Sequence, residues 1–114
     1  MCKIYGYVRV STIQQKVERQ INNIIGFNGD AIIISEKQSG KDIDNRAEFK
    51  KLLNKVKPGD TIIFDEVSRM SRNADEGFSL YMELLSKGIS LVFLKERHID
   101  TDEYKRRTQK HIEK

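Results

Sequence analysis

The sequence predicts an α/β fold: a mostly parallel sheet of four or more strands with helices on both faces, in three layers. Short apolar runs alternate along the chain with segments whose apolar residues recur every three or four positions. This alternation is typical of parallel sheets, because two parallel strands need a long crossover connection that is usually a helix. The length of 114 residues fits a single domain.

A strand and a helix are predicted in the first thirty residues. Residues 3–10 are rich in β-branched and aromatic side chains, which favours a strand. Ser11 and Thr12 follow as helix-starting residues, and the glycines within residues 26–29 end the helical pattern. The apolar face of this helix consists of Val17, Ile21, Ile24 and Ile25.

A second strand and a second helix are predicted next. Residues 31–35 form a continuous apolar run, which predicts a strand buried on both faces. Residues 36–45 are polar, contain Gly40 and show no period, so we expect a loop there. A helix is expected from about residue 46 to residue 56, and its apolar face consists of Phe49, Leu52, Leu53 and Val56.

The second half of the chain repeats this alternation. A Pro-Gly-Asp turn at residues 58–60 precedes a short apolar strand over residues 61–64. A helical turn near residues 68–72 comes next, followed by a helix over about residues 74–87 and a fourth strand over residues 89–94. The apolar face of that helix consists of Phe78, Tyr81, Leu84 and Leu85.

The composition excludes several classes of protein. The net charge is +4 with neutral histidines and 38% of the residues are hydrophobic, as in ordinary globular chains. No apolar run approaches the ~20 residues of a membrane-spanning helix, and no secretory signal is present, so we expect a cytoplasmic protein with no membrane partner. Cys2 is the only cysteine, and His98 and His111 are the only histidines, so neither an internal disulfide nor a structural zinc site is expected.

Side chains that suit a phosphate follow the predicted strands. Tyr7, Arg9 and Ser11 alternate along the first strand and therefore point to the same face. Arg69 and Arg72 are three residues apart on the predicted helical turn and share a face as well. The carboxyl ends of parallel strands meet at one edge of the sheet, where such folds bind ligands. Because arginine forms paired hydrogen bonds with phosphate oxygens, this edge favours phosphoryl chemistry over amide hydrolysis.

Each of these residues also has a simpler structural explanation when it is taken alone. Ser11 lies three residues before Gln14 and fits a helix N-cap. Arg69 and Arg72 fit a solvated helix face, and Tyr7 fits packing within the sheet. Their expected convergence on one edge favours the functional interpretation.

The order of these motifs resembles that of the serine recombinases, also called the resolvase/invertase family. Tyr7, Arg9 and Ser11 match the family's Tyr-x-Arg-x-Ser signature. Three further segments match the family: Ser39-Gly40 with the downstream Arg46, the pair Arg69 and Arg72 within residues 68–72, and residues 98–101. All of these matches occur in the family's order, over residues 3–101.

The resemblance implies a site-specific DNA recombinase whose serine nucleophile becomes joined to a DNA 5′ phosphate. Ser11 would be this nucleophile, and Arg9, Arg69 and Arg72 would hold the scissile phosphate and offset its charge in the transition state. No metal or other cofactor is implied. The general base is open between an arginine, Glu36 and a water molecule. The residues implied to position the phosphate or support the arginines are Tyr7, Gln15, Ser39 and Arg46.

Two positions depart from the family's pattern. Glu36 stands where many members have Asp, which retains a carboxylate on a longer arm. Ser68 stands just before the first paired arginine, where many members also have Asp, so a charge that could orient an arginine is missing. The second change resembles the large transposon or integrase type. Glu36 and Ser68 complete the set of supporting residues.

The resemblance also implies parts of a larger protein. We expect residues 1–100 to form the catalytic domain and residues 101–114 to begin a charged helix, with no DNA-binding domain in this chain. The full protein is implied to bind double-stranded DNA as a homodimer that forms a tetramer, because paired subunits must cut opposite strands. The chain alone is expected to be inactive in recombination and to bind DNA weakly, in a salt-dependent manner.

Two other functions stay open. A non-catalytic α/β module for oligomerisation or DNA tethering would account for Ser68, but it has no need of a nucleophile and clustered arginines. A metal-dependent nuclease-like domain would use Asp65 and Glu66 with Asp42 or Asp44. None of these carboxylates lies at the end of the first strand, so the recombinase is favoured over both.

Overall fold

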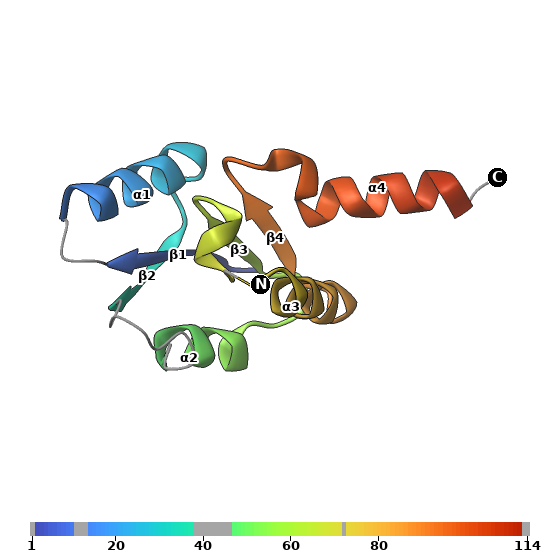
Figure 1. The fold of residues 1–114 in the computed structure, drawn as a ribbon, viewed down its shortest axis with the longest axis horizontal. Coiled ribbons are helices and arrows are strands. Elements are labelled where there is room, and N and C mark those ends of the chain that lie inside the picture. Colours follow the sequence, from blue (N-terminus) through green and yellow to red (C-terminus); the bar gives the residue numbers. More distant parts are fainter. Residues whose placement is uncertain (1, 11–13, 38–46, 72, 113–114) are drawn as a thin grey trace.

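Four parallel strands form one sheet in the order β2-β1-β3-β4 (Figure 1). The computed structural model describes residues 2–10, 14–37, 47–71 and 73–112, with side chains except at residues 10, 14–16 and 108–112. The predicted α/β fold class with a parallel sheet is confirmed. The strands are β1 (Ile4–Val10), β2 (Ile32–Lys37), β3 (Thr61–Phe64) and β4 (Ser90–Phe93).

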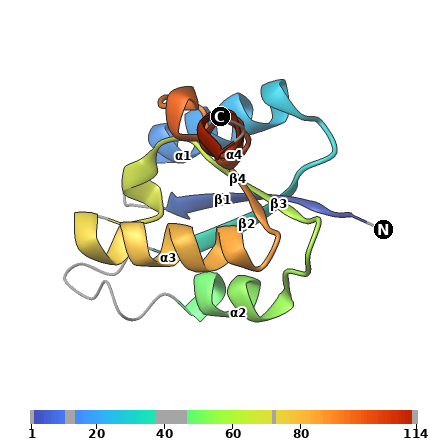
Figure 2. The ribbon, with the colours of Figure 1, turned by 90° about the vertical axis from the view of Figure 1, so that its right-hand side faces the viewer.

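Helices cover both faces of this sheet, as the alternating pattern predicts. The helices α1 and α4 lie on one side of the sheet, and α2 and α3 lie on the other (Figures 1 and 2). Among the described residues, none of the helices is long and apolar enough to cross a membrane. The helices are α1 (Gln14–Phe27), α2 (Ala47–Lys55), α3 (Ala74–Ser86) and α4 (Thr101–Ile112), with 3-10 turns η1 (Val67–Arg69) and η2 (Arg97–Ile99).

Alternate residues of the central strand β1 enter two separate core layers. Tyr5 and Tyr7 pack among the residues of α2 and α3, whereas Val8 packs with Ile24 of α1 on the opposite face. A Cβ atom at Gly6 would lie 2.7 Å from Ile24 Cγ2, so glycine at this position allows α1 to approach β1 closely. The buried layer on the α2 and α3 side consists of Tyr5, Tyr7, Phe49, Leu52, Ile62, Phe64, Met70, Leu84, Ile89, Leu91 and Phe93.

The second strand differs from its prediction in burial and in length. Its first residue, Ile32, is 45% exposed, so the expectation of a strand buried on both faces is wrong. The physical reason is that β2 lies at the edge of the sheet, where only part of its surface is covered. Glu36 and Lys37 belong to this strand rather than to the predicted loop.

The segment after β3 also differs from its prediction. The expected helical turn is a shorter 3-10 turn, η1, over Val67–Arg69. In α3 the predicted apolar residue Phe78 is 64% exposed, because the smaller Gly77 occupies the inward position against Ser71. The start of α3 follows from its cap: Asn73 Oδ1 accepts hydrogen bonds from the next helical N–H groups.

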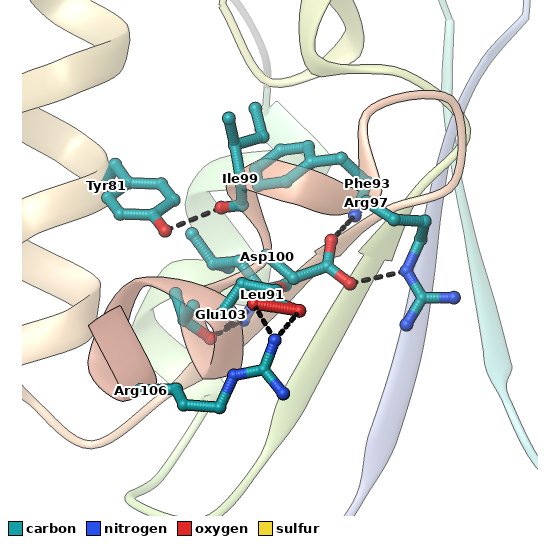
Figure 3. Close-up of polar contacts among 9 residues, drawn as sticks. Tyr81, Leu91, Phe93, Arg97, Ile99, Asp100, Glu103 and Arg106 are labelled. Atoms are coloured by element: carbon teal, nitrogen blue, oxygen red, sulfur yellow. Dashed lines mark hydrogen bonds and ion pairs between the residues drawn. The ribbon is translucent and has the colours of Figure 1, made fainter. Parts of the chain in front are cut away.

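Side chains at the start of α4 bind the outer edge of β4 (Figure 3). The N–H of Phe93 donates to Asp100 Oδ1 at 2.8 Å, and the N–H of Leu91 donates to Thr101 Oγ1 at 2.9 Å. Tyr81 Oη donates to the carbonyl oxygen of Ile99 at 2.6 Å. Burial, followed by the nearby Asp100 charge, raises the pKa of Tyr81 to about 12, so its hydroxyl stays protonated. These contacts fix the direction in which α4 leaves the sheet.

A buried carboxylate connects the amino end of the sheet to the turn before β3. Asp60 Oδ1 accepts the N–H of Lys3 and Asp60 Oδ2 accepts the N–H of Lys57, both at 2.9 Å. Burial raises the pKa of Asp60, but these hydrogen bonds and the two lysine charges outweigh burial, and the net pKa lies below its ordinary value of 3.8.

We expect Asp60→Asn to lower the free energy of unfolding by about 1–3 kcal/mol near neutral pH, because an amide cannot accept both N–H groups. Ionised Asp60 stabilises the fold fully above its unfolded pKa of 3.8, and this effect disappears as the pH falls through the lower folded-state pKa. Urea unfolding of both proteins should therefore show a difference that shrinks in acid. Asp30→Asn is the matched control, because Asp30 is exposed and its substitution should change the free energy of unfolding by less than about 0.5 kcal/mol. An equal loss of stability in both variants would contradict the stabilising role of Asp60.

Candidate active site

The carboxyl ends of the strands bring several predicted site residues to one edge of the sheet. Arg9, near the end of β1, lies opposite Glu36 of β2 in the strand register. Tyr7 lies opposite Phe64, the last residue of β3, and η1 with Arg69 follows shortly after that strand. Arg9 is 6% exposed, and strand alternation places it on the same face as Tyr7.

Glu36 fixes Tyr7 against the start of α2. Tyr7 Oη donates to Glu36 Oε1 at 3.2 Å, and the N–H of Phe49 donates to the same oxygen at 2.9 Å. The N–H of Glu48 donates to Glu36 Oε2 at 3.3 Å. A buried carboxylate at a helix N-terminus is stabilised by these N–H groups and by the helix dipole. The Tyr7 ring is also held by Phe49, with ring centroids 4.8 Å apart.

A second charged cluster surrounds the turn that bears Arg69. Ser68 Oγ donates to Glu66 Oε1 at 2.5 Å, and Lys95 Nζ donates to Glu66 Oε2 at 3.0 Å. The buried Asp65 accepts a hydrogen bond from Asn23 Nδ2 at 2.9 Å, and it pairs with Lys95 at 3.6 Å. Lys95 follows β4, so this cluster connects the ends of two neighbouring strands.

The charges of this cluster favour the ionised forms of its members. Hydrogen bonds from Ser68 and Lys95 lower the pKa of Glu66 despite its partial burial, and the charge of Arg69 contributes in the same direction. The hydrogen bond to Glu66 and the charge of Asp65 raise the pKa of Lys95.

The carboxylates that the metal-dependent alternative would use have donors within the protein. Asp65 and Glu66 accept hydrogen bonds from Asn23, Ser68 and Lys95, as above. Across the ranges that the structure describes, no three His, Cys, Asp or Glu residues lie together as a metal site would require. Asp42 and Asp44 lie outside those ranges.

Gln20 is a residue of this edge that the sequence analysis missed. It is 2% exposed and its side chain contacts the backbone of Arg9 at two points. The available signal is its place on the apolar face of α1, between Val17 and Ile24 at helical spacing. A glutamine within such a face needs a buried hydrogen-bonding partner.

The structure therefore places part of the predicted site. Tyr7, Arg9, Glu36, Ser68 and Arg69 lie at or near the carboxyl edge of the sheet. The predicted convergence of the serine with the arginines stays a prediction, because the other predicted residues are not described there. Ser11, Ser39, Arg46 and Arg72 lie outside the described residues, and Gln15 belongs to α1 but its side chain is not described.

Comparisons with known proteins agree with this architecture. The chain matches the family model described as "Resolvase, N terminal domain" over residues 4–112. It is 36% identical over 98 residues to the transposon Tn501 resolvase of Pseudomonas aeruginosa, covering 86% of this chain and 50% of that protein. It is 37% identical over 83 residues to the DNA-invertase hin of Salmonella typhimurium, covering 73% of this chain and 43% of that protein.

A solved structure shares the fold. The crystal structure of a resolvase family site-specific recombinase from Streptococcus pneumoniae aligns with a TM-score of 0.64 at 23% identity, covering 99% of this chain and 91% of that one. The chain spans about half the length of the curated relatives it matches. The resemblance indicated by the sequence motifs is confirmed, and the chain belongs to the family of resolvase N-terminal domains.

Proposed function

We propose that the chain is the catalytic domain of a site-specific serine recombinase that cleaves and rejoins double-stranded DNA. The observation that supports this most is the meeting of Arg9, with Tyr7 and Glu36, and the Arg69 turn at one edge of the sheet. Ser11 follows Val10, the last residue of β1, directly in the sequence. Membership of a family whose relatives are named resolvases and DNA invertases supports the same function.

In the proposed reaction the Ser11 hydroxyl oxygen attacks a DNA phosphodiester. A bond forms between the serine oxygen and phosphorus as the serine hydroxyl gives its proton to a base. The bond from phosphorus to the 3′ oxygen breaks, and that oxygen takes up a proton and leaves as a hydroxyl, so no net proton is gained or lost. Attack of a 3′ hydroxyl on the phosphoserine reverses these steps, so rejoining needs no nucleotide cofactor. Arg9, Arg69 and Arg72 offset the charge that develops on the non-bridging oxygens.

The remaining residues have positioning roles in this proposal. Gln15, Ser39 and Arg46 orient the phosphate or support the arginines. Glu36 accepts hydrogen bonds on both oxygens, which supports a role in holding Tyr7 and the start of α2 rather than a role as the general base. A separate DNA-binding domain supplies sequence-specific contacts, and the protein acts in the cytoplasm.

We expect Ser11→Ala to abolish covalent attachment of the protein to DNA, by about 10³-fold or more, because the nucleophile is removed. The complete protein is incubated with a supercoiled plasmid carrying a site selected by binding from a random-sequence library. The reaction is stopped with SDS, and protein-linked DNA is quantified for both proteins.

DNA binding is the control in this experiment. Ser11→Ala should bind the site within about twofold of the wild-type affinity, because a single hydroxyl contributes little to a large charged interface. Wild-type levels of adduct in the variant would refute Ser11 as the nucleophile. Binding without any adduct in either protein would favour the tethering module.

We expect chelation of divalent metals with EDTA to leave the rate of adduct formation within about twofold of its value without chelator, because arginines rather than a metal offset the phosphate charge. Time courses of adduct formation with and without EDTA, at constant ionic strength, measure this. Cleavage that stops in EDTA, returns with added Mg²⁺ and leaves no protein on the DNA would instead support the carboxylate nuclease.

A mostly apolar groove supports the proposal of paired subunits. The groove has a volume of about 690 Å³ and lies between α3 and the start of α4. Phe78 and Tyr104, which line it, are 64% and 37% exposed. Cleavage of both strands of a duplex needs at least two copies of the nucleophile, so we propose that a second copy of the protein covers this groove in a dimer that then forms a tetramer.

We expect Phe78→Lys to raise the dimer dissociation constant by about tenfold or more, because a charge replaces an apolar side chain at the centre of the contact. Sedimentation equilibrium of the complete protein measures the constant. Ile25→Lys is the matched control, since Ile25 is 39% exposed on α1 and does not line this groove. Equal dissociation constants for wild type and Phe78→Lys would place the contact elsewhere.

A further inference from the structure

The side chain of Gln20 binds both polar groups of one backbone residue, Arg9. Gln20 Nε2 donates to the carbonyl oxygen of Arg9 at 3.2 Å, and Gln20 Oε1 accepts the N–H of Arg9 at 3.3 Å. Both groups are buried, and Gln20 is 2% exposed. A two-point contact of this kind restrains the backbone at Arg9 more than one hydrogen bond would, because rotation of the peptide groups breaks both.

The contact occurs where the strand ladder on one side of β1 has ended. The pairing of β1 with β3 ends at Tyr7 and Phe64, whereas its pairing with β2 continues through Arg9 to Val10. Among the described residues, the Gln20 amide therefore supplies the hydrogen bonds that a further residue of β3 would supply. Within the described strands, pairing with β2 holds the last part of β1 on one side, and Gln20 adds hydrogen bonds on the other side.

The close packing of α1 on β1 makes this contact possible. Gly6 allows Ile24 to approach the strand, and Ile24 lies one helical turn after Gln20 on the same face of α1. The short distance between the helix and the strand brings the glutamine amide within hydrogen-bonding distance of the backbone. The packing of α1 against β1 in the core therefore positions the Gln20 side chain.

We propose that Gln20 is a positioning residue for cleavage: it holds the backbone of Arg9 so that the guanidinium and the chain leading to Ser11 keep one direction. This inference rests on the proposed function. Two residues span at most about 7 Å, so a backbone rotation of about 10° at Arg9 can displace residue 11 by up to about 1 Å. A displacement of this size can lower the rate of a chemical step by about 100-fold.

The test compares Gln20→Met with Asn22→Leu in the complete protein. Met has nearly the volume of Gln and fits an apolar helix face, but it cannot make the two hydrogen bonds. Asn22 is the matched control because the substitution also removes an amide side chain from α1, at an exposed position outside the two clusters of the candidate site. Gln20→Asn, which keeps the amide on a shorter arm, is a second variant should Gln20→Met fail to fold.

We expect Gln20→Met to lower the single-turnover rate of adduct formation by about 10- to 100-fold at saturating DNA. The dissociation constant for DNA should stay within about twofold of wild type, and Asn22→Leu should stay close to wild type in both measurements. Gln20→Met should also speed amide hydrogen exchange at Arg9 by about tenfold, as expected for loss of one hydrogen bond.

The measurements separate this inference from the proposed function. Unchanged exchange at Arg9 overturns the contact, whatever the DNA result. Faster exchange with a cleavage rate equal to that of Asn22→Leu overturns the positioning role. The comparison of wild type with Ser11→Ala tests the proposed function itself. If the wild type forms no adduct that depends on Ser11, both the proposed function and the positioning role of Gln20 are refuted. The exchange measurement would still test the contact between Gln20 and Arg9.

Discussion

The close approach of α1 to the central strand β1 is the constraint on which the rest of the structure depends. Gly6 leaves room for Ile24, so the helix lies near enough for a buried glutamine to bind the backbone of Arg9. The same strand pairs with β2 and β3 and places Tyr7 in the opposite core layer. One seven-residue strand thereby aligns both layers of the core with the edge where the arginines lie. A side chain at residue 6 would push the helix away and disturb all of these contacts together.

Much of the fold follows from the sequence because period and turn chemistry agree along the chain. Four strands and their connecting helices lie near their predicted positions, since apolar runs and helical spacing report burial directly. The position of a strand within the sheet, at the edge or in the centre, does not follow from the sequence in the same way, because strand order depends on contacts between distant residues. Nothing within the apolar run that begins at Ile32 reveals that β2 lies at the edge. Phe78 is exposed for a related reason, because helical spacing identifies an apolar stripe but not which of its members faces solvent.

The residues of the candidate site also divide into those that the sequence predicts and those that only the structure reveals. Tyr7 and Arg9 are predictable because strand alternation fixes their common face. The apolar face of α1 marks Gln20 as buried but does not identify Arg9 as its partner, and Lys95 reaches the edge through contacts with residues far away in the sequence. The role of Glu36 also emerges only in three dimensions, where its carboxylate accepts two N–H groups of α2 as well as the Tyr7 hydroxyl. The carboxylates at this edge thus have amide, hydroxyl or ammonium donors, which moderates the negative charge that an approaching phosphate would meet.

The binding of Asp100 and Thr101 to β4 also bears on solubility. An exposed strand edge presents N–H groups on which a strand from another molecule can form, and this is a common route to aggregation. On β4 the N–H groups of Leu91 and Phe93 already donate to those two side chains, so this edge offers little to an incoming strand. At the opposite edge of the sheet, Lys37 places a charge on the last residue of β2, which also disfavours the addition of another strand.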